Sequence, residues 1–378
     1  MSPTNGGREN LDSDKPKTDN PRGQGRDRPG PQRDSSRQRP IYSAIDLGTN
    51  NCRLLVAKQT YTGFRIIDAF SRVVKLGEGL TEHGELSQGA MDRTIEALNI
   101  CQEKLEKRRV THMRHVATAA CRVASNADQF VDRVKAETGL ALEIITTAEE
   151  ARLAVAGCQT LITPNHRYAL VFDIGGGSTE LVWVRIRGRG RTSIVGWTSV
   201  PWGVVNLTEK YMKGKHEASA DDYQRMMDAV GVVLKPFMEK YDIYETVKQR
   251  RVQYLGTSGT VTTLASLHFE LPRYNRNKID GAWVNPGSIR ELARKVGNMS
   301  HKERIIQPCI GPERADLVIA GCAILDAIMD VDGLKSLRVA DRGIREGILR
   351  SLMKDQARAQ HNQNRQRAEK NRAKGQPS

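Results

Sequence analysis

The stretch that decides the fold is Val171-Phe172-Asp173-Ile174-Gly175-Gly176-Gly177-Ser178-Thr179-Glu180. Core packing alone does not explain an apolar strand that ends in an acid and three glycines. Glycines let the backbone approach an anion closely and let successive N–H groups converge on it. Ser178 and Thr179 add hydroxyl donors, and Asp173 can hold a cation. We therefore interpret the stretch as a phosphate-binding turn.

An upstream segment repeats this pattern as Ile45-Asp46-Leu47-Gly48-Thr49-Asn50-Asn51. It again places an aspartate, a glycine and short polar side chains at the end of an apolar strand. One glycine-rich turn alone is weak evidence for a phosphate site, because ordinary tight turns also contain glycine. Two turns with the same aspartate-glycine pattern are much stronger evidence. We expect two half-sites that face each other, in which the backbone N–H groups of Gly48–Asn50 and Gly175–Thr179 bind phosphate.

Length and composition favour two ordinary domains, since the 378 residues are 38% hydrophobic. The chain has no run of about eighteen apolar residues, and its first 40 residues lack the apolar region of a secretory signal. We therefore expect a cytoplasmic protein that is not bound to a membrane. The six cysteines are scattered without a CxxC spacing, which favours reduced thiols over disulfides or a zinc site.

The formal net charge is +15 at pH 7. Residues 1–40 and 354–378 are rich in Pro, Gly, Ser, Asn, Gln and Arg, so we expect two disordered basic tails. Such tails either keep a protein soluble or hold nucleic acid loosely. The positive surplus on the body of the chain suits a polyanionic substrate.

The order strand, glycine turn, strand occurs twice between these tails. The predicted strands are Ile41–Leu47, Cys52–Ala57, Tyr168–Phe172 and Leu181–Ile186, and helical patterns follow each pair. We infer an α/β protein with two domains of related topology, residues 41–153 and 154–353. Ligands of such folds lie at the carboxyl ends of strands, so the predicted site is a cleft between the two glycine turns.

Taken together, the motifs resemble the exopolyphosphatase and guanosine-pentaphosphate phosphatase family over residues 41–353. They are Asp46–Asn50, Val116–Ala124, Glu149–Arg152, Asp173–Glu180, Gly256–Thr260 and Arg342–Gly347, in that order. The resemblance implies two ribonuclease-H-like domains of the actin, Hsp70 and sugar-kinase superfamily, with the active site in the cleft between them. Long members of the family append a helical module that resembles an HD phosphohydrolase domain, whereas this chain resembles the short, two-domain members.

Phosphoryl transfer between negative groups needs charge neutralisation, and Asp46 and Asp173 can hold a divalent cation for it. Mg²⁺ suits two isolated aspartates, because it keeps several water ligands. Glu180 either orders a metal-bound water or simply begins the return strand. The resemblance implies that Glu150 is the catalytic base. The alternative is that Glu149 and Glu150 are only favourable charges at a helix start.

Arginines would bind further phosphate groups in a bidentate way. The resemblance places Arg122 at the cleft, although it could also be a solvated loop charge. Arg53 and Arg304 are further predicted phosphate ligands. Only His112 and His115 have a ligand-like spacing among the histidines, so we expect no histidine metal site.

The leading hypothesis is an exopolyphosphatase that removes terminal phosphate from inorganic polyphosphate. The alternative within the same chemistry is removal of the 5′ γ-phosphate of guanosine pentaphosphate. Two other classes stay open: a kinase or ATPase of the superfamily, and a non-catalytic protein that binds polyphosphate or RNA. The sequence also leaves open whether the protein forms a homodimer.

Overall fold

The first sheet carries the first glycine turn. The computed structural model describes residues 40–61, 63–188 and 191–374, so nearly all of the predicted N-terminal tail lies outside the described residues. Five strands pair in the order β3-β2-β1-β4-β5. They are β1 (Ile41–Leu47), β2 (Asn51–Thr60), β3 (Gly63–Val73), β4 (His112–Ala117) and β5 (Glu143–Ile144). Strand β1 runs antiparallel to β2 and parallel to β4.

The second sheet repeats this arrangement around the second glycine turn. Its order is β10-β11-β9-β6-β7-β8. The strands are β6 (Tyr168–Ile174), β7 (Thr179–Arg187), β8 (Arg191–Val200), β9 (Val252–Thr257), β10 (Trp283–Val284) and β11 (Leu337–Ala340). Strand β6 runs antiparallel to β7 and parallel to β9, as β1 does with β2 and β4. The repeated topology confirms the predicted fold class.

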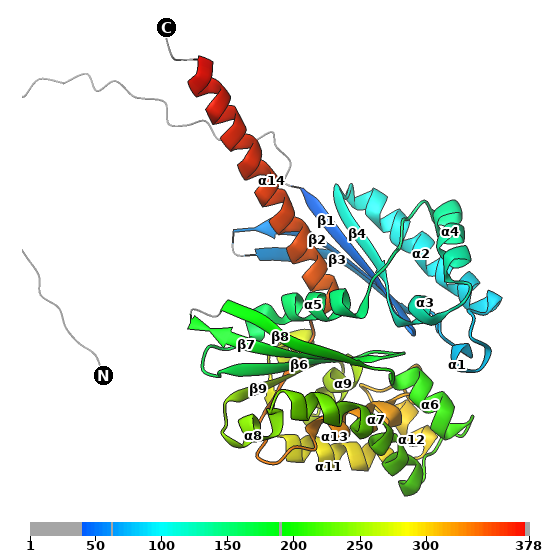
Figure 1. Cartoon of the computed structure of the whole chain (residues 1–378). Coiled ribbons are helices and arrows are strands. Elements are labelled where there is room, and N and C mark those ends of the chain that lie inside the picture. The colour runs from blue at the N-terminus through cyan, green and yellow to red at the C-terminus, as the bar shows by residue number, and fades with distance from the viewer. Residues whose placement is uncertain (1–39, 62, 189–190, 375–378) are drawn as a thin grey trace, which may run out of the picture. The chain divides into compact units, whose positions relative to one another are not determined.

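Helices cover both faces of each sheet (Figure 1). The longer ones are α2 (Gln88–Arg108), α4 (Ala127–Thr138), α5 (Thr147–Cys158), α6 (Val204–Met212), α7 (Ala220–Lys240), α9 (Gly259–His268), α11 (Pro286–Gly297), α13 (Val318–Met329) and α14 (Ile344–Lys374). The shorter ones are α1 (Leu80–His83), α3 (Ala119–Val123), η1 (Gln159–Leu161), α8 (Ile243–Lys248), α10 (Arg276–Ile279) and α12 (His301–Ile306). In the described part of the chain, no helix is long and apolar enough to cross a membrane.

Helix α5 lies between the two sheets (Figure 1). Its Leu153 packs with β1 and α14, whereas Ala151 and Val155 pack against β6 and β7. The predicted domain boundary after residue 153 therefore falls inside a helix that contributes to the cores of both halves.

Glycines allow α5 and α14 to cross at close range. A Cβ atom on Gly157 would overlap the carbonyl of Gly343, and one on Gly347 would overlap the carbonyl of Leu153. This contact holds the first turns of α14 on the face of the first sheet that α5 also covers, where Ile348 and Leu349 are buried. The sequence assigned residues 344–353 to the second domain, but their side chains pack on the first sheet.

The predicted disorder of residues 354–378 is wrong as far as Lys374, because α14 continues to that residue. The segment is polar but contains good helix formers, and it has no proline or glycine before Gly375. An ion pair of 3.0 Å between Arg365 and Glu369, one turn apart, supports the exposed part. A helix that starts in the core can extend outward in this way, because the costly first turn is already formed.

The close helix crossing predicts that Gly347→Ala destabilises the protein by about 1–3 kcal/mol, as overpacking usually does. Gly231→Ala is the matched control, because Gly231 lies in α7 with no atom within 4 Å of an added Cβ. That change should be neutral or stabilise by up to about 1 kcal/mol through helix propensity. Denaturant unfolding of both variants measures the difference, and equal stabilities would contradict the packing described.

Candidate active site

The two glycine turns are in direct contact. A Cβ atom on Gly176 would lie 2.9 Å from the Cβ of Thr49 and 3.2 Å from the backbone nitrogen of Asn50. One on Gly177 would lie 2.7 Å from the Oγ1 atom of Thr49. The triple glycine therefore permits the turns of the two sheets to meet, in the facing arrangement that the sequence predicted for them.

Both turns direct unused donors into one cleft. Gly48 and Gly175 close their own turns by donating N–H bonds of 2.9 Å. Among the described residues, by contrast, the N–H groups of Thr49, Asn50 and Gly176–Ser178 donate to no protein acceptor. The Oγ1 atom of Thr49 is also buried without a partner. Unpaired backbone N–H groups at a glycine turn are the donors from which anion-binding concavities are built.

The start of α9 adds a third source of positive potential to the cleft. The Oγ atom of Ser258 caps this ten-residue helix by accepting a 3.1 Å bond from the N–H of Val261. Gly259 and Thr260, in its first turn, line the same cleft as the two glycine turns. A helix N-terminus attracts anions through its free N–H groups and its dipole.

Five acids line the cleft, and four of them, Asp46, Glu150, Asp173 and Glu180, affect one another's pKa. Asp46 and Asp173 end the equivalent strands β1 and β6, and Glu180 pairs with Asp173 across the β6–β7 hairpin. Glu150 lies in the first turn of α5 and is buried. The structure thus brings together the predicted base and the three predicted metal ligands.

The acids raise each other's pKa. Burial raises the pKa of Glu150 to about 8, and the charge of Glu180 adds to the effect. Burial raises the pKa of Asp173 to about 7, with contributions from Glu150 and Asp46. Burial also raises the pKa of Glu180 to about 7 and that of Asp46 above its ordinary value. The cleft therefore holds more potential negative charge than its own cations compensate.

Two arginines oppose this excess of negative charge. Arg53 stands opposite Asp46 in the β1–β2 register and lines the cleft. Arg345, at the start of α14, also acts to lower the pKa of Asp46 and of Asp173. Arg345 lies in the Arg342–Gly347 motif, but its sequence gives no sign that it reaches the acids.

Arg122 contacts the predicted base. Its Nη1 atom lies 2.6 Å from the Oε2 atom of Glu150 and donates to the carbonyl of Ile145 at 3.2 Å. The solvated-loop alternative does not fit this ion pair, because only 16% of the Arg122 side chain and 8% of the Glu150 side chain are exposed. Arg122 therefore orients Glu150.

The neighbouring Glu149 differs from Glu150. It pairs with Arg152 and with Arg114 on the surface, and chiefly the Arg152 hydrogen bond lowers its pKa to about 2. The two adjacent glutamates thus have opposite electrostatic environments, which fits a chemical role for Glu150 alone.

Two predicted phosphate ligands are used elsewhere. Arg304 is fully buried away from the cleft and donates to the carbonyls of Met299 and Ala315 at 2.6 and 2.8 Å. Its assignment as a phosphate ligand was wrong. The hydroxyl of Thr179 donates a 2.8 Å hydrogen bond to the carbonyl of Trp202, so this hydroxyl already has a partner within the protein.

The hydroxyl of Ser178 donates to Glu180 at 2.7 Å, and Ser199 donates to the same carboxylate oxygen at 3.0 Å. Ser178 thus offers the cleft its N–H group and orients an acid with its side chain. Arg314 is a further cation that lines the cleft. Its Nη1 atom donates a 2.8 Å hydrogen bond to the hydroxyl of Thr263.

Residues 55–356 match the model of a protein family described as the Ppx/GppA phosphatase family. The chain belongs to this family. It is 28% identical over 316 residues to the guanosine-5′-triphosphate,3′-diphosphate pyrophosphatase of Photobacterium profundum. The aligned region covers 83% of this chain and 59% of that protein. The chain thus spans about three fifths of the length of the curated relatives it matches.

Solved Ppx/GppA structures share the fold. The Aquifex aeolicus PPX-GPPA enzyme is 30% identical with a TM-score of 0.67, over 82% of this chain and 99% of that one. An exopolyphosphatase from Cytophaga hutchinsonii is 25% identical with a TM-score of 0.74, over 83% of this chain and 98% of that one. These findings confirm the resemblance inferred from the motifs.

The raised pKa of Glu150 predicts how stability depends on pH in excess chelator. In the unfolded chain the pKa of this acid lies near its ordinary value of 4.5, whereas burial raises its pKa to about 8 in the folded chain. Folding therefore takes up a proton between these values, and the free energy of unfolding falls as pH rises through this window. Glu150→Gln should remove about 1–3 kcal/mol of the fall between pH 5 and 8.

Glu149→Gln is the matched control for this prediction. The lowered pKa of Glu149 stabilises the fold above pH 4.5 and loses its effect as pH falls toward 2, so it adds no slope between pH 5 and 8. Denaturant unfolding across that range tests the pair of variants. An unchanged slope in Glu150→Gln would show that Glu150 is already ionised in the folded protein at pH 5.

Proposed function

We propose that this protein is an exopolyphosphatase, which hydrolyses the terminal phosphoanhydride of inorganic polyphosphate and releases orthophosphate. The observation that carries the proposal is the contact between the two glycine turns, whose unpaired N–H groups share one cleft with Asp46, Glu150, Asp173 and Glu180. Such donors neutralise phosphate oxygens without moving during the reaction, which is the main source of catalysis in phosphoryl transfer.

The acids support a proposed Mg²⁺ site formed by Asp46, Asp173 and Glu180. The donors are all oxygens, and their mutual repulsion leaves room for a positive charge. Within the described residues these three do not bring their oxygens within 4.8 Å of one another. That spacing suits a cation that keeps several waters. When bound, Mg²⁺ would supply charge for the terminal phosphate oxygens.

Glu150 is the proposed general base. Its raised pKa means that its carboxylate can accept a proton from water near neutral pH, as an efficient base should. Arg122 holds the Oε2 atom and leaves the other carboxylate oxygen for the water. The start of α9 and the glycine turns would then hold the terminal phosphate in position for attack by that water.

The cleft suits the end of a chain. Its volume is about 190 Å³, below the roughly 300 Å³ from which pockets usually enclose a whole drug-sized ligand. A terminal phosphate would be bound and the rest of the substrate would lie outside the cleft. The net charge of the whole chain, +15, favours a polyanion as the substrate. This preference for a polymer is the reason we place polyphosphate first.

Removal of the 5′ γ-phosphate of guanosine pentaphosphate is the second candidate. The observation that favours it is the name of the Photobacterium profundum relative, a guanosine-5′-triphosphate,3′-diphosphate pyrophosphatase. Both substrates present a terminal phosphate to the same donors. Phosphate release from long polyphosphate, guanosine pentaphosphate and ATP, measured side by side with Mg²⁺ and with chelator, tests the proposal. Faster release from either nucleotide than from polyphosphate would overturn it.

We also propose that the enzyme works in the cytoplasm. All six cysteines are free and buried, and the structure places no two of them in a disulfide. Structural disulfides are typical of proteins in oxidising compartments, whereas free thiols persist in reducing ones. Fractionation of cells that express the protein from its own promoter measures the location directly.

Glu150→Gln should lower turnover by about two to four orders of magnitude, because the amide keeps the shape of the side chain and cannot accept the proton. Tripolyphosphate binding should change little. Glu149→Gln is the matched control and should keep near-normal turnover, since Glu149 pairs with surface arginines. Steady-state phosphate release measures both variants, and near-normal turnover in Glu150→Gln would remove Glu150 from the mechanism.

Arg122→Ala should raise the pKa of Glu150 further, because it removes the positive charge at 2.6 Å. The acidic limb of the pH profile of kcat should therefore move to higher pH. Arg122→Lys should restore part of the shift, since it keeps the charge but not the guanidinium geometry. A profile that stays in place while KM for polyphosphate rises would mean that Arg122 binds substrate instead.

A further inference from the structure

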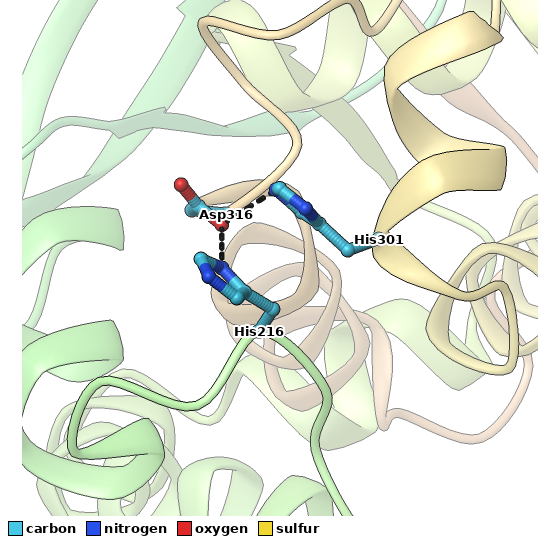
Figure 2. Close-up of side chains that lie close together, drawn as sticks. All are labelled: His216, His301 and Asp316. Carbon is cyan, nitrogen blue, oxygen red and sulfur yellow. Dashed lines mark hydrogen bonds and ion pairs between the residues drawn. The ribbon is translucent and has the colours of Figure 1, made fainter.

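Two histidines and an aspartate converge at a second place in the fold (Figure 2). His216 lies in the loop between α6 and α7, His301 is the first residue of α12, and Asp316 lies in the loop before α13. The Oδ1 atom of Asp316 is 2.8 Å from Nδ1 of His216 and 3.0 Å from Nε2 of His301. In the described ranges this is the one group of three or more potential ligands within 4.8 Å of one another.

Arg304 builds the framework under this cluster. Its guanidinium donates to the carbonyls of His216 and Ala315, and at 2.6 Å to that of Met299. The three acceptors belong to the three segments that carry the cluster, and Arg304 itself is fully buried. A buried charge that joins three backbone segments fixes their spacing, so the backbone that carries the cluster is held in place.

The first turn of α12 is fixed independently. Ser300 and Glu303 form a reciprocal capping box, in which each side chain accepts from the backbone N–H of the other. His301 begins the helix inside this box. Its ring stacks on that of His216, with centroids 4.2 Å apart and planes at 21°. Both rings are thereby oriented with one nitrogen toward the same carboxylate oxygen (Figure 2).

We propose that His216, His301 and Asp316 bind a divalent first-row transition metal, with Zn²⁺ as the best match. Two imidazole nitrogens and one carboxylate are a ligand set that zinc uses with water in the fourth position. Because 61% of the His216 side chain is exposed, solvent can supply that ligand and the ion can enter directly. The donor set differs from the all-oxygen cleft, so the two sites select different metals.

The required adjustment is small. Ligands about 2.0–2.1 Å from a tetrahedral zinc ion lie roughly 3.3 Å apart. The two nitrogen-to-oxygen distances, 2.8 and 3.0 Å, are shorter by a few tenths of an ångström. Rotation of the half-exposed Asp316 and His216 side chains can open this gap without moving the backbone that Arg304 holds.

The site adjoins a segment of the proposed active cleft. Asp316 stands between Arg314 and Leu317, which both line the cleft. Zinc bound to Asp316 would therefore fix the segment that carries Arg314. This consequence is separate from the proposed hydrolysis, because it needs only that the metal binds.

Calorimetric titration of ZnCl₂ into the metal-free full chain, with millimolar Mg²⁺ present to occupy the cleft acids, tests the proposal. We expect one zinc per chain with a micromolar or tighter Kd. His216→Ala and His301→Ala should each weaken binding by at least about tenfold. His361→Ala, on the exposed part of α14, is the matched control and should bind as the wild type does.

Imidazole ¹⁵N spectra identify the ligands independently, because zinc should shift Nδ1 of His216 and Nε2 of His301. Circular dichroism verifies that the variants are folded. Because His216 is exposed, His216→Ala should disturb the fold less than His301→Ala does. Absence of binding tighter than millimolar overturns the proposal. Binding that both variants leave unchanged overturns it equally, since the zinc would then lie elsewhere.

Discussion

Repulsion among four carboxylates, two buried and two partly buried, is the constraint on which the rest of this structure depends. Asp46, Glu150, Asp173 and Glu180 come from both halves of the chain and line one cleft. Each charge in a poorly solvated place raises the pKa of its neighbours. A fold that confines them loses stability near neutral pH, unless protons or cations compensate. The site therefore favours a ligand that brings positive charge with it.

The backbone creates this confinement and also provides the opposite charge. The contact of Gly176 with Thr49 brings the carboxyl ends of two sheets together, and the crossing of α5 with Gly347 of α14 brings Glu150 to the same place. The same turns direct free N–H groups into the cleft. One packing arrangement thus supplies both the acids that can bind a cation and the N–H donors that can bind phosphate oxygens. This combination suits a phosphate substrate that binds together with a cation.

Sequence reasoning found the parts of the site that lie on local motifs. Asp46, Asp173 and the glycine turns follow strands directly, so their place in the cleft could be predicted. Arginines could not be assigned in this way, because a long side chain reaches its partner through tertiary packing. Arg304 satisfies three carbonyls in the core. The helical tail was missed because its polar composition resembles disorder, while its start is fixed in the core.

The central claim is that the two facing turns bind one phosphate chain end. Thr49→Val tests it most directly, because the Oγ1 atom of Thr49 is buried in the cleft without a protein partner. The measurement is the calorimetric affinity of Glu150→Gln protein for tripolyphosphate with Mg²⁺, with and without Thr49→Val. The account predicts at least about tenfold weaker binding, as for a lost hydrogen bond to a charged group, and no loss of thermal stability. Unchanged affinity with a lower melting temperature would contradict it.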